Sequence, residues 1–151
     1  IIDATAGLGR DALILSSLVD KVILIEKVAW VSALLEDGLR NAKELLPHLS
    51  NTQVVCCDSK QYLSNLKTKP DAIYLDPMFE NAGKSKAKRE VQALRDLTTQ
   101  SNEEGLLEVA LKRAKDRVVV KRHKKVKNLA GLKPTFSLTG RVVRYDVYSI
   151  S

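Results

Sequence analysis

Cysteine, histidine and long apolar runs are scarce in this chain of 151 residues. The only cysteines, Cys56 and Cys57, are adjacent, and adjacent cysteines rarely reach disulfide geometry. We expect them to be small buried residues in a reducing compartment, which favours the cytoplasm. The two histidines, His48 and His123, have no neighbours that would complete a ligand set, so no metal is predicted. No apolar run approaches the roughly 20 residues of a membrane span, and no signal peptide opens the chain.

The remaining composition is typical of one globular domain, with 44% apolar and 28% charged residues. Its net charge of +7 is unevenly distributed: residues 1–83 carry −3, and residues 84–144 carry +11. This asymmetry favours an anionic partner, with nucleic acid more compatible than a membrane, although a merely solvated basic surface is the alternative. The chain starts without Met, directly on an expected central strand, so we expect an N-terminal portion to be missing.

The first twelve residues organise the rest of the chain. Two apolar residues lead into Asp3, a turn containing Gly7 and Gly9 follows, and an apolar pattern begins at Ala12. This order predicts a strand, a tight turn and a helix N-terminus, where unpaired N–H groups face a ligand. The carboxylates of Asp3 and Asp11 would repel a pyrophosphate, so they favour a cofactor with positive charge. A turn that binds nothing is the alternative.

Alternating apolar patterns predict an α/β fold with a mostly parallel sheet of about seven strands. Two final apolar segments at hairpin spacing predict that the last strand is antiparallel to its neighbours. The expected strands are 1–2, 21–25, 53–57, 72–75, 117–121, 135–138 and 142–150. The expected helices are 12–18, 28–46, 59–66, 91–97 and 104–114.

Acidic or polar residues follow the predicted strands at the edge of the sheet where ligands bind. Glu26 lies 19 residues after Gly7, the offset at which a carboxylate accepts hydrogen bonds from ribose hydroxyls. Asp58 and Ser59 would lie beside an adenine. Asp76 follows the fourth strand. Together with Asp3, Glu26 and Asp58 it places an acidic residue at the ends of four strands, and this pattern predicts one site for a nucleotide-like cofactor.

The segment Asp76-Pro77-Met78-Phe79 follows the fourth strand and predicts the reaction centre. The exocyclic amine of a base is a poor nucleophile because its lone pair is delocalised into the ring. Asp76 and a backbone carbonyl freed by Pro77 could accept its two N–H bonds and direct the lone pair at a methyl donor. Phe79 could stack on the base. An ordinary proline turn is the alternative.

Several segments together resemble the RsmJ (YhiQ) family over essentially the whole chain. They are Asp3-Ala4-Thr5-Ala6-Gly7-Leu8-Gly9-Arg10-Asp11-Ala12, Tyr74-Leu75-Asp76-Pro77-Met78-Phe79, Gly105-Leu106-Leu107-Glu108 and Arg117-Val118-Val119-Val120-Lys121-Arg122. Members are class I S-adenosylmethionine methyltransferases that modify a guanine N2 amine of small-subunit (16S) ribosomal RNA. The resemblance implies one Rossmann-like methyltransferase domain over residues 1–151, with S-adenosylmethionine as cofactor and 16S RNA or the small ribosomal subunit as partner.

The resemblance also implies a cofactor site lined by Arg10-Asp11, Glu26-Lys27, Asp58-Ser59 and Asp76. The chain departs from the family at three places: Glu80 and the segment 123–127 replace prolines or proline-containing sequence, and Asp58 replaces a small polar residue. These departures concern the shape of the target-base loop more than the cofactor site.

Two basic segments, 84–89 and 121–127, adjoin strand ends and are predicted to contact phosphate. Their cations are Lys84, Lys86, Lys88, Arg89, Lys121, Arg122, Lys124, Lys125 and Lys127. Three other functions remain open: a dinucleotide oxidoreductase, a methyltransferase for another RNA or a protein amide, and a silent RNA-binding module. Asp11 and the Asp-Pro-Met-Phe segment favour methyl transfer over a dinucleotide oxidoreductase. The acidic residues at the strand ends are all present, which argues against a silent RNA-binding module.

Overall fold

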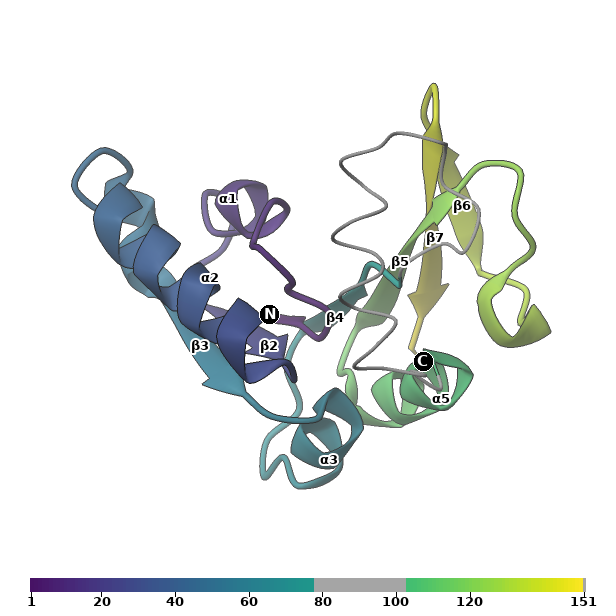
Figure 1. The fold of residues 1–151 in the computed structure, drawn as a ribbon. Helices are drawn as coiled ribbons and strands as arrows, with labels where there is room; N and C mark the ends of the chain where they lie inside the picture. The colour runs from purple at the N-terminus through teal and green to yellow at the C-terminus, as the bar shows by residue number, and fades with distance from the viewer. Residues whose placement is uncertain (78–102, 151) are drawn as a thin grey trace.

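A computed structural model describes residues 1–77 and 103–150 of the chain (Figure 1). In this part of the chain the strands form one seven-stranded sheet of order β3-β2-β1-β4-β5-β7-β6. The strands are β1 (Ile2–Asp3), β2 (Val22–Glu26), β3 (Thr52–Cys56), β4 (Ala72–Leu75), β5 (Arg117–His123), β6 (Phe136–Thr139) and β7 (Val143–Ser149). Strands β1 to β5 pair in parallel, and β7 pairs antiparallel with both β5 and β6. The predicted α/β fold with an antiparallel C-terminal strand is confirmed.

The helices connect the parallel strands and pack on both faces of the sheet (Figure 1). They are α1 (Ala12–Leu15), α2 (Ala29–Ala42), α3 (Ser59–Ser64) and α5 (Glu103–Arg113), with short 3₁₀ helices η1 (Pro47–Asn51) and η2 (Leu129–Gly131). The expected helix at 91–97 lies outside the described residues. The other expected helices are present, each with ends that differ from the predicted bounds by a few residues.

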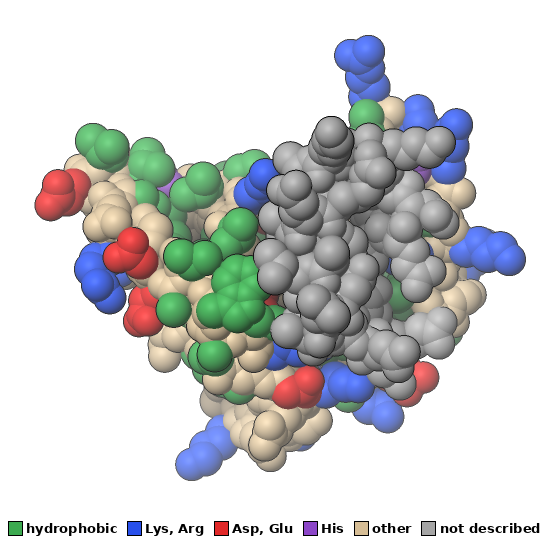
Figure 2. Space-filling view, in the orientation of Figure 1, with side chains coloured by type: hydrophobic (Ala, Val, Ile, Leu, Met, Phe, Trp, Pro, Cys, Tyr) green, Lys and Arg blue, Asp and Glu red, His purple; other side chains and the backbone are tan. Residues whose placement is uncertain are grey.

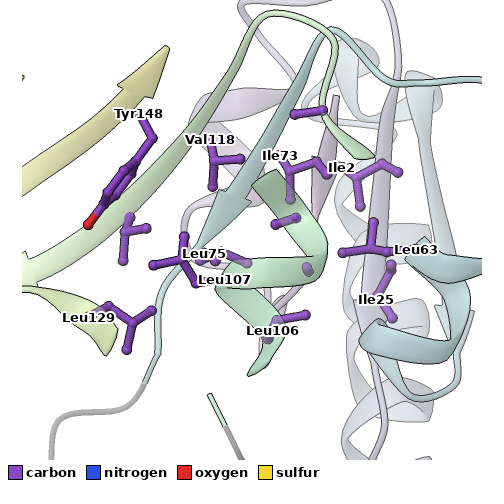
Figure 3. Close-up of a cluster of buried hydrophobic side chains, with 14 residues drawn as sticks. Ile2, Ile25, Leu63, Ile73, Leu75, Leu106, Leu107, Val118, Leu129 and Tyr148 are labelled. Atoms are coloured by element: carbon purple, nitrogen blue, oxygen red, sulfur yellow. The ribbon is translucent and has the colours of Figure 1, made fainter. Parts of the chain in front are cut away.

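Strand β2 shows how the sheet separates two layers of core. Val22 and Leu24 pack with residues of α1 and α2, whereas Ile25 packs with residues of α3 and α5. This division follows from the two-residue period of a strand, and burial on both faces explains the continuous apolar run in the sequence. Figure 3 shows the second layer, in which Leu107 of α5 lies against the strands. The two layers fix β1, β2 and β4 with their carboxyl ends at one edge of the sheet.

Helix α1 is shorter than the apolar pattern 12–18 predicts. Ser16 and Ser17 follow its single turn, and their hydroxyls donate to the carbonyl oxygens of Leu13 and Ile14. Such local side-chain bonds compete with helix continuation. Of the apolar pattern in this segment, Leu13, Ile14 and Leu18 are exposed; Figure 2 shows hydrophobic side chains gathered over α1 and α2.

The cysteines are free thiols, as predicted, but their predicted burial is wrong. Cys56 is exposed and Cys57 is half-buried. The reason is the position of β3, which is the last strand on its side of the sheet and therefore has one open edge. Among the described residues, no helix is long and apolar enough to cross a membrane.

Candidate active site

The glycine turn between β1 and α1 has the backbone conformation that the sequence predicts. Gly7 and Gly9 both have positive φ, at 54° and 75°, where a Cβ would be strained. A Cβ on Gly9 would also collide with the Leu35 side chain of α2. The turn can therefore lie directly against α2 only because position 9 has no side chain.

Asp3 ends β1 and is almost completely buried, with 2% of its surface exposed. Its Oδ1 accepts hydrogen bonds from the N–H and hydroxyl of Thr5, at 3.0 and 3.4 Å. Burial is the main reason that its pKa rises to about 7, and the charges of Asp11 and Asp76 raise it further. These three carboxyl groups are therefore close enough to interact, and we call them the carboxylate cluster.

Glu26 connects the glycine turn to the start of α2. Its Oε2 accepts from the N–H of Gly7 at 3.1 Å, and its Oε1 accepts from the N–H of Val28 at 2.8 Å. The predicted 19-residue offset thus corresponds to a direct hydrogen bond within the protein. A carboxylate oxygen has two lone pairs, so each oxygen can still accept from a ribose hydroxyl.

The turn after β4 is attached to the glycine turn through Thr5. The backbone N–H of Asp76 donates to the Thr5 hydroxyl at 2.6 Å, and the same hydroxyl donates to Asp3. Pro77, the next residue, is buried. The two loops predicted to hold the cofactor and the target base are therefore joined by one hydroxyl group.

Lys121 of β5 lies between the other two carboxylates of the cluster. Its Nζ is 2.8 Å from Asp11 Oδ2 and 2.9 Å from Asp76 Oδ2, and only 20% of its side chain is exposed. The Tyr74 hydroxyl also donates to Asp11 Oδ2, at 2.7 Å. Burial would raise the pKa of Asp11, but the bonds from Lys121 and Tyr74 outweigh it and lower that pKa below its usual value. For Asp76 burial dominates, and the pKa is raised although Lys121 opposes the shift.

Asp58 and Ser59, predicted to lie beside an adenine, also have structural partners. Asp58 caps α3, since its Oδ1 accepts from the N–H of Gln61 at 2.9 Å. The Ser59 hydroxyl donates to the carbonyl oxygen of Ala4 at 2.6 Å, which joins α3 to β1. The bond from Ser59 thus holds the start of α3 beside the residue that follows β1. Arg10 and Lys27 are exposed.

Three polar residues of this site were absent from the predicted cofactor set: Thr5, Tyr74 and, as a partner of carboxylates, Lys121. The register of the sheet could have identified Lys121. Leu75 pairs with Val120 in parallel strands, so the next residues, Asp76 and Lys121, are neighbours at the strand ends. Lys121 therefore differs from the exposed lysines of the segment 121–127, because its ammonium points at carboxylates within the protein.

The rest of the basic segment forms an exposed loop after β5. Lys124, Lys125 and Lys127 are exposed, whereas Arg122 is half-buried and its Nη2 donates to the Lys127 carbonyl oxygen at 2.9 Å. The predicted contacts of Lys84, Lys86, Lys88 and Arg89, and the stacking of Phe79, lie outside the described residues.

Arg144 of β7 binds the backbone of this loop. Its Nη1 donates to three backbone carbonyl oxygens of the loop, those of His123, Lys124 and Val126, at 3.4, 3.0 and 2.8 Å. Its Nε donates to the fully buried Asp146 at 2.8 Å. One guanidinium group therefore fixes the backbone from which the exposed lysines project.

The site as a whole has four carboxyl groups, the carboxylate cluster and Glu26, and one ammonium group around the glycine turn. This balance favours a ligand with positive charge and disfavours a polyphosphate. The surroundings of Asp76 also provide an anionic acceptor for N–H groups of a substrate. Over residues 1–77 and 103–150, no group of three or more side chains suited to hold a metal ion occurs.

Comparison with known proteins agrees with this chemistry. Residues 1–150 match the model of a family described as "Putative SAM-dependent methyltransferase", where SAM is S-adenosylmethionine. The chain is 43% identical to a protein of Shewanella amazonensis and 42% identical to one of Nitrosococcus oceani, both named ribosomal RNA small subunit methyltransferase J. The matches cover 98% of this chain but 62% and 61% of those proteins.

A solved structure shows the same architecture. The chain superposes on a SAM-dependent methyltransferase from Neisseria gonorrhoeae with a TM-score of 0.79 and 34% sequence identity. The superposition covers 98% of this chain and 60% of that protein. The chain thus spans about three fifths of the length of the relatives that it matches.

Proposed function

The chain belongs to this family of SAM-dependent methyltransferases, and we propose that it transfers a methyl group from SAM to the N2 amine of a guanine in 16S ribosomal RNA. The observation that carries the proposal is the carboxylate cluster beside the glycine turn, with Asp76 at the end of β4. The names of the ribosomal RNA methyltransferases similar to this chain support the substrate. If its substrate is an RNA of the small ribosomal subunit, the protein acts in the cytoplasm.

The residues around the glycine turn fit SAM because its α-amino and sulfonium groups are cationic. The proposed cofactor-binding residues are Asp3, Gly7, Gly9, Arg10, Asp11, Glu26, Lys27, Asp58, Ser59 and Asp76. Bound there, SAM supplies an electrophilic methyl group. Glu26 accepts from the ribose hydroxyls through lone pairs that Gly7 and Val28 leave free.

Asp76, Pro77 and Phe79 are proposed to act on the base. Asp76 accepts an N–H of the guanine amine, which favours the pyramidal amine with its lone pair available for attack. Pro77 leaves neighbouring carbonyl oxygens free because it has no N–H to donate. The guanine must leave its stack to reach these groups, and Phe79 stacks on it there. No strong base is needed, since the methylated ammonium that forms loses its proton readily.

Methyl transfer itself tests the proposal. Labelled SAM is incubated with the protein and naked 16S RNA, free small subunits or assembled ribosomes, and the modified nucleoside is identified. We expect label on guanine N2 in at least one of the first two. Label on another RNA position or on protein would instead support the alternative methyltransferase functions, and no transfer would contradict the proposal.

Cofactor binding provides a second test, through Glu26. Replacing Glu26 by Ala should weaken SAM binding by about 1.5–3 kcal/mol, because charge-assisted hydrogen bonds to ribose are lost. Isothermal titration with SAM measures the change, and Glu36→Ala, an exposed change on α2, is the matched control. If NAD raises the melting temperature of the protein and SAM does not, the cofactor is wrongly assigned.

RNA binding is tested through Lys124, Lys125 and Lys127. Replacing all three by Gln should reduce the slope of log affinity against log salt by about 0.7–0.9 for each phosphate that is no longer neutralised. Replacing the exposed Lys43, Lys67 and Lys69 instead removes the same charge from other elements and should leave the slope unchanged. Filter binding of labelled 16S RNA over a salt series measures both. If the two triple variants have equal slopes, Lys124, Lys125 and Lys127 do not contact phosphate and belong to a merely solvated basic surface.

A further inference from the structure

The Lys121 ammonium has the carboxylates of two residues as partners. Nζ lies 3.1 and 2.8 Å from the two oxygens of Asp11, and 2.9 Å from Asp76 Oδ2. Two carboxylates at hydrogen-bond distance balance the single positive charge of this ammonium, so it is not an isolated cation that would attract a phosphate. The position of Lys121 in the sheet, next to Asp76 in the adjacent parallel strand, makes this arrangement a consequence of strand register.

The two carboxylates depend on Lys121 unequally. Asp11 also accepts from the Tyr74 hydroxyl, whereas the only hydrogen-bond donor found for the Asp76 side chain among the described residues is Lys121. Without the ammonium, burial and the charges of Asp11 and Asp3 would all favour protonation of Asp76, and two adjacent carboxyls can share one proton. A protonated Asp76 would present a donor where the target amine needs an acceptor.

We propose that Lys121 is a positioning residue that holds the Asp76 carboxylate in its acceptor form and orientation. This inference rests on the proposed function, in which Asp76 accepts from the guanine amine. Lys121 acts through Asp76 and does not contact RNA. The ionisable groups that contact this ammonium are Asp11 and Asp76, and those that act on these two carboxyls in turn are Tyr74 of β4 and Asp3 of β1.

The test compares Lys121→Met and Lys121→Arg with the wild-type protein at saturating SAM from pH 5.5 to 9. In Lys121→Met the acid limb of the kcat profile should move upward by about 1–3 pH units, because an opposite charge at this distance shifts a pKa by that amount. At a pH below the displaced limb, each unit of displacement lowers kcat about tenfold. The KM for 16S RNA and the salt slope of RNA binding should not change. Lys121→Arg keeps the positive charge and should return the limb to the wild-type position.

Carbon-13 NMR titration of the aspartate carboxyls provides a readout that does not need activity. In Lys121→Met the resonance of Asp76, assigned with Asp76→Asn, should titrate at higher pH than in the wild type. An unmoved resonance in folded Lys121→Met would overturn the inference, as would an unmoved acid limb or a reduced salt slope. If the wild-type protein transfers no methyl group, the proposed function fails, and the NMR titration alone decides the role of Lys121. Should Lys121→Met not fold, Lys121→Gln replaces it in both measurements.

Discussion

Replacing Asp76 by Asn is expected to slow methyl transfer by about 10- to 150-fold at saturating SAM. The amide keeps the size of the side chain but is a neutral acceptor, and it can direct an N–H at the target amine. Loss of one charge-assisted hydrogen bond costs about 1.5–3 kcal/mol, which gives this range of rates. Because the bond is made mainly in the transition state, kcat should fall much more than the KM for RNA rises.

The matched control for this change is Asp71→Asn. Asp71 precedes the amino end of β4, whereas Asp76 follows its carboxyl end. The exposed carboxylate of Asp71 pairs with Lys115 at 3.3 Å. Exposed pairs of this kind contribute little to stability, so this variant should keep the wild-type rate. Single-turnover measurement of methyl transfer separates the chemical step from product release. A wild-type rate for Asp76→Asn at saturating SAM would contradict the role proposed for the Asp76 carboxylate.

Replacing Asp3 by Asn is expected to stabilise the protein against unfolding, and more so at high pH. The pKa of Asp3 rises from its usual 3.8 to about 7 in the folded state, chiefly through burial. Between these pH values the folded protein binds more protons than the unfolded chain, so its stability falls as the pH rises. From pH 5 to pH 8 this loss amounts to about 2–3 kcal/mol, and Asn, which does not ionise, avoids it.

Urea unfolding at pH 5 and pH 8 measures this effect. The Asn oxygen can still accept from Thr5, so the hydrogen bonds of the turn are preserved. Asp37→Asn, an exposed change on α2, should show no such dependence. A stability difference between wild type and Asp3→Asn that is the same at both pH values would show that Asp3 ionises normally. The same variant should bind SAM more weakly, because a negative charge near the cationic groups is lost.

The succession of strands and helices along the chain was predictable because it follows from local patterns. The run 21–25 is apolar throughout since β2 is buried on both faces, and Glu26 follows it at the ligand-binding edge. The hairpin spacing at the end of the chain identified β6 and β7 without reference to other proteins. Burial of each cysteine was not predictable in this way, because it depends on β3 being an edge strand.

The internal partners of the site residues required the three-dimensional structure. Basic residues in the segment 121–127 look alike in sequence, yet Lys121 points at two carboxylates while Lys124 is exposed. The difference depends on which strand neighbours β5, and the sequence does not state the register of a parallel pair. Likewise, the length of α1 depended on Ser16 and Ser17, whose hydroxyls bond to the backbone where the apolar pattern suggested that the helix continues.

The position of β7 has a consequence for the order of events during synthesis. This strand is the last in sequence but lies between β5 and β6, so β6 has no partner in the sheet until β7 has left the ribosome. Arg144, which fixes the backbone of the basic loop, is carried by the same strand. The strands β1, β2 and β4 that carry the glycine turn all precede β7 in the sequence, so the nascent chain can assemble this turn before Arg144 orders the loop after β5.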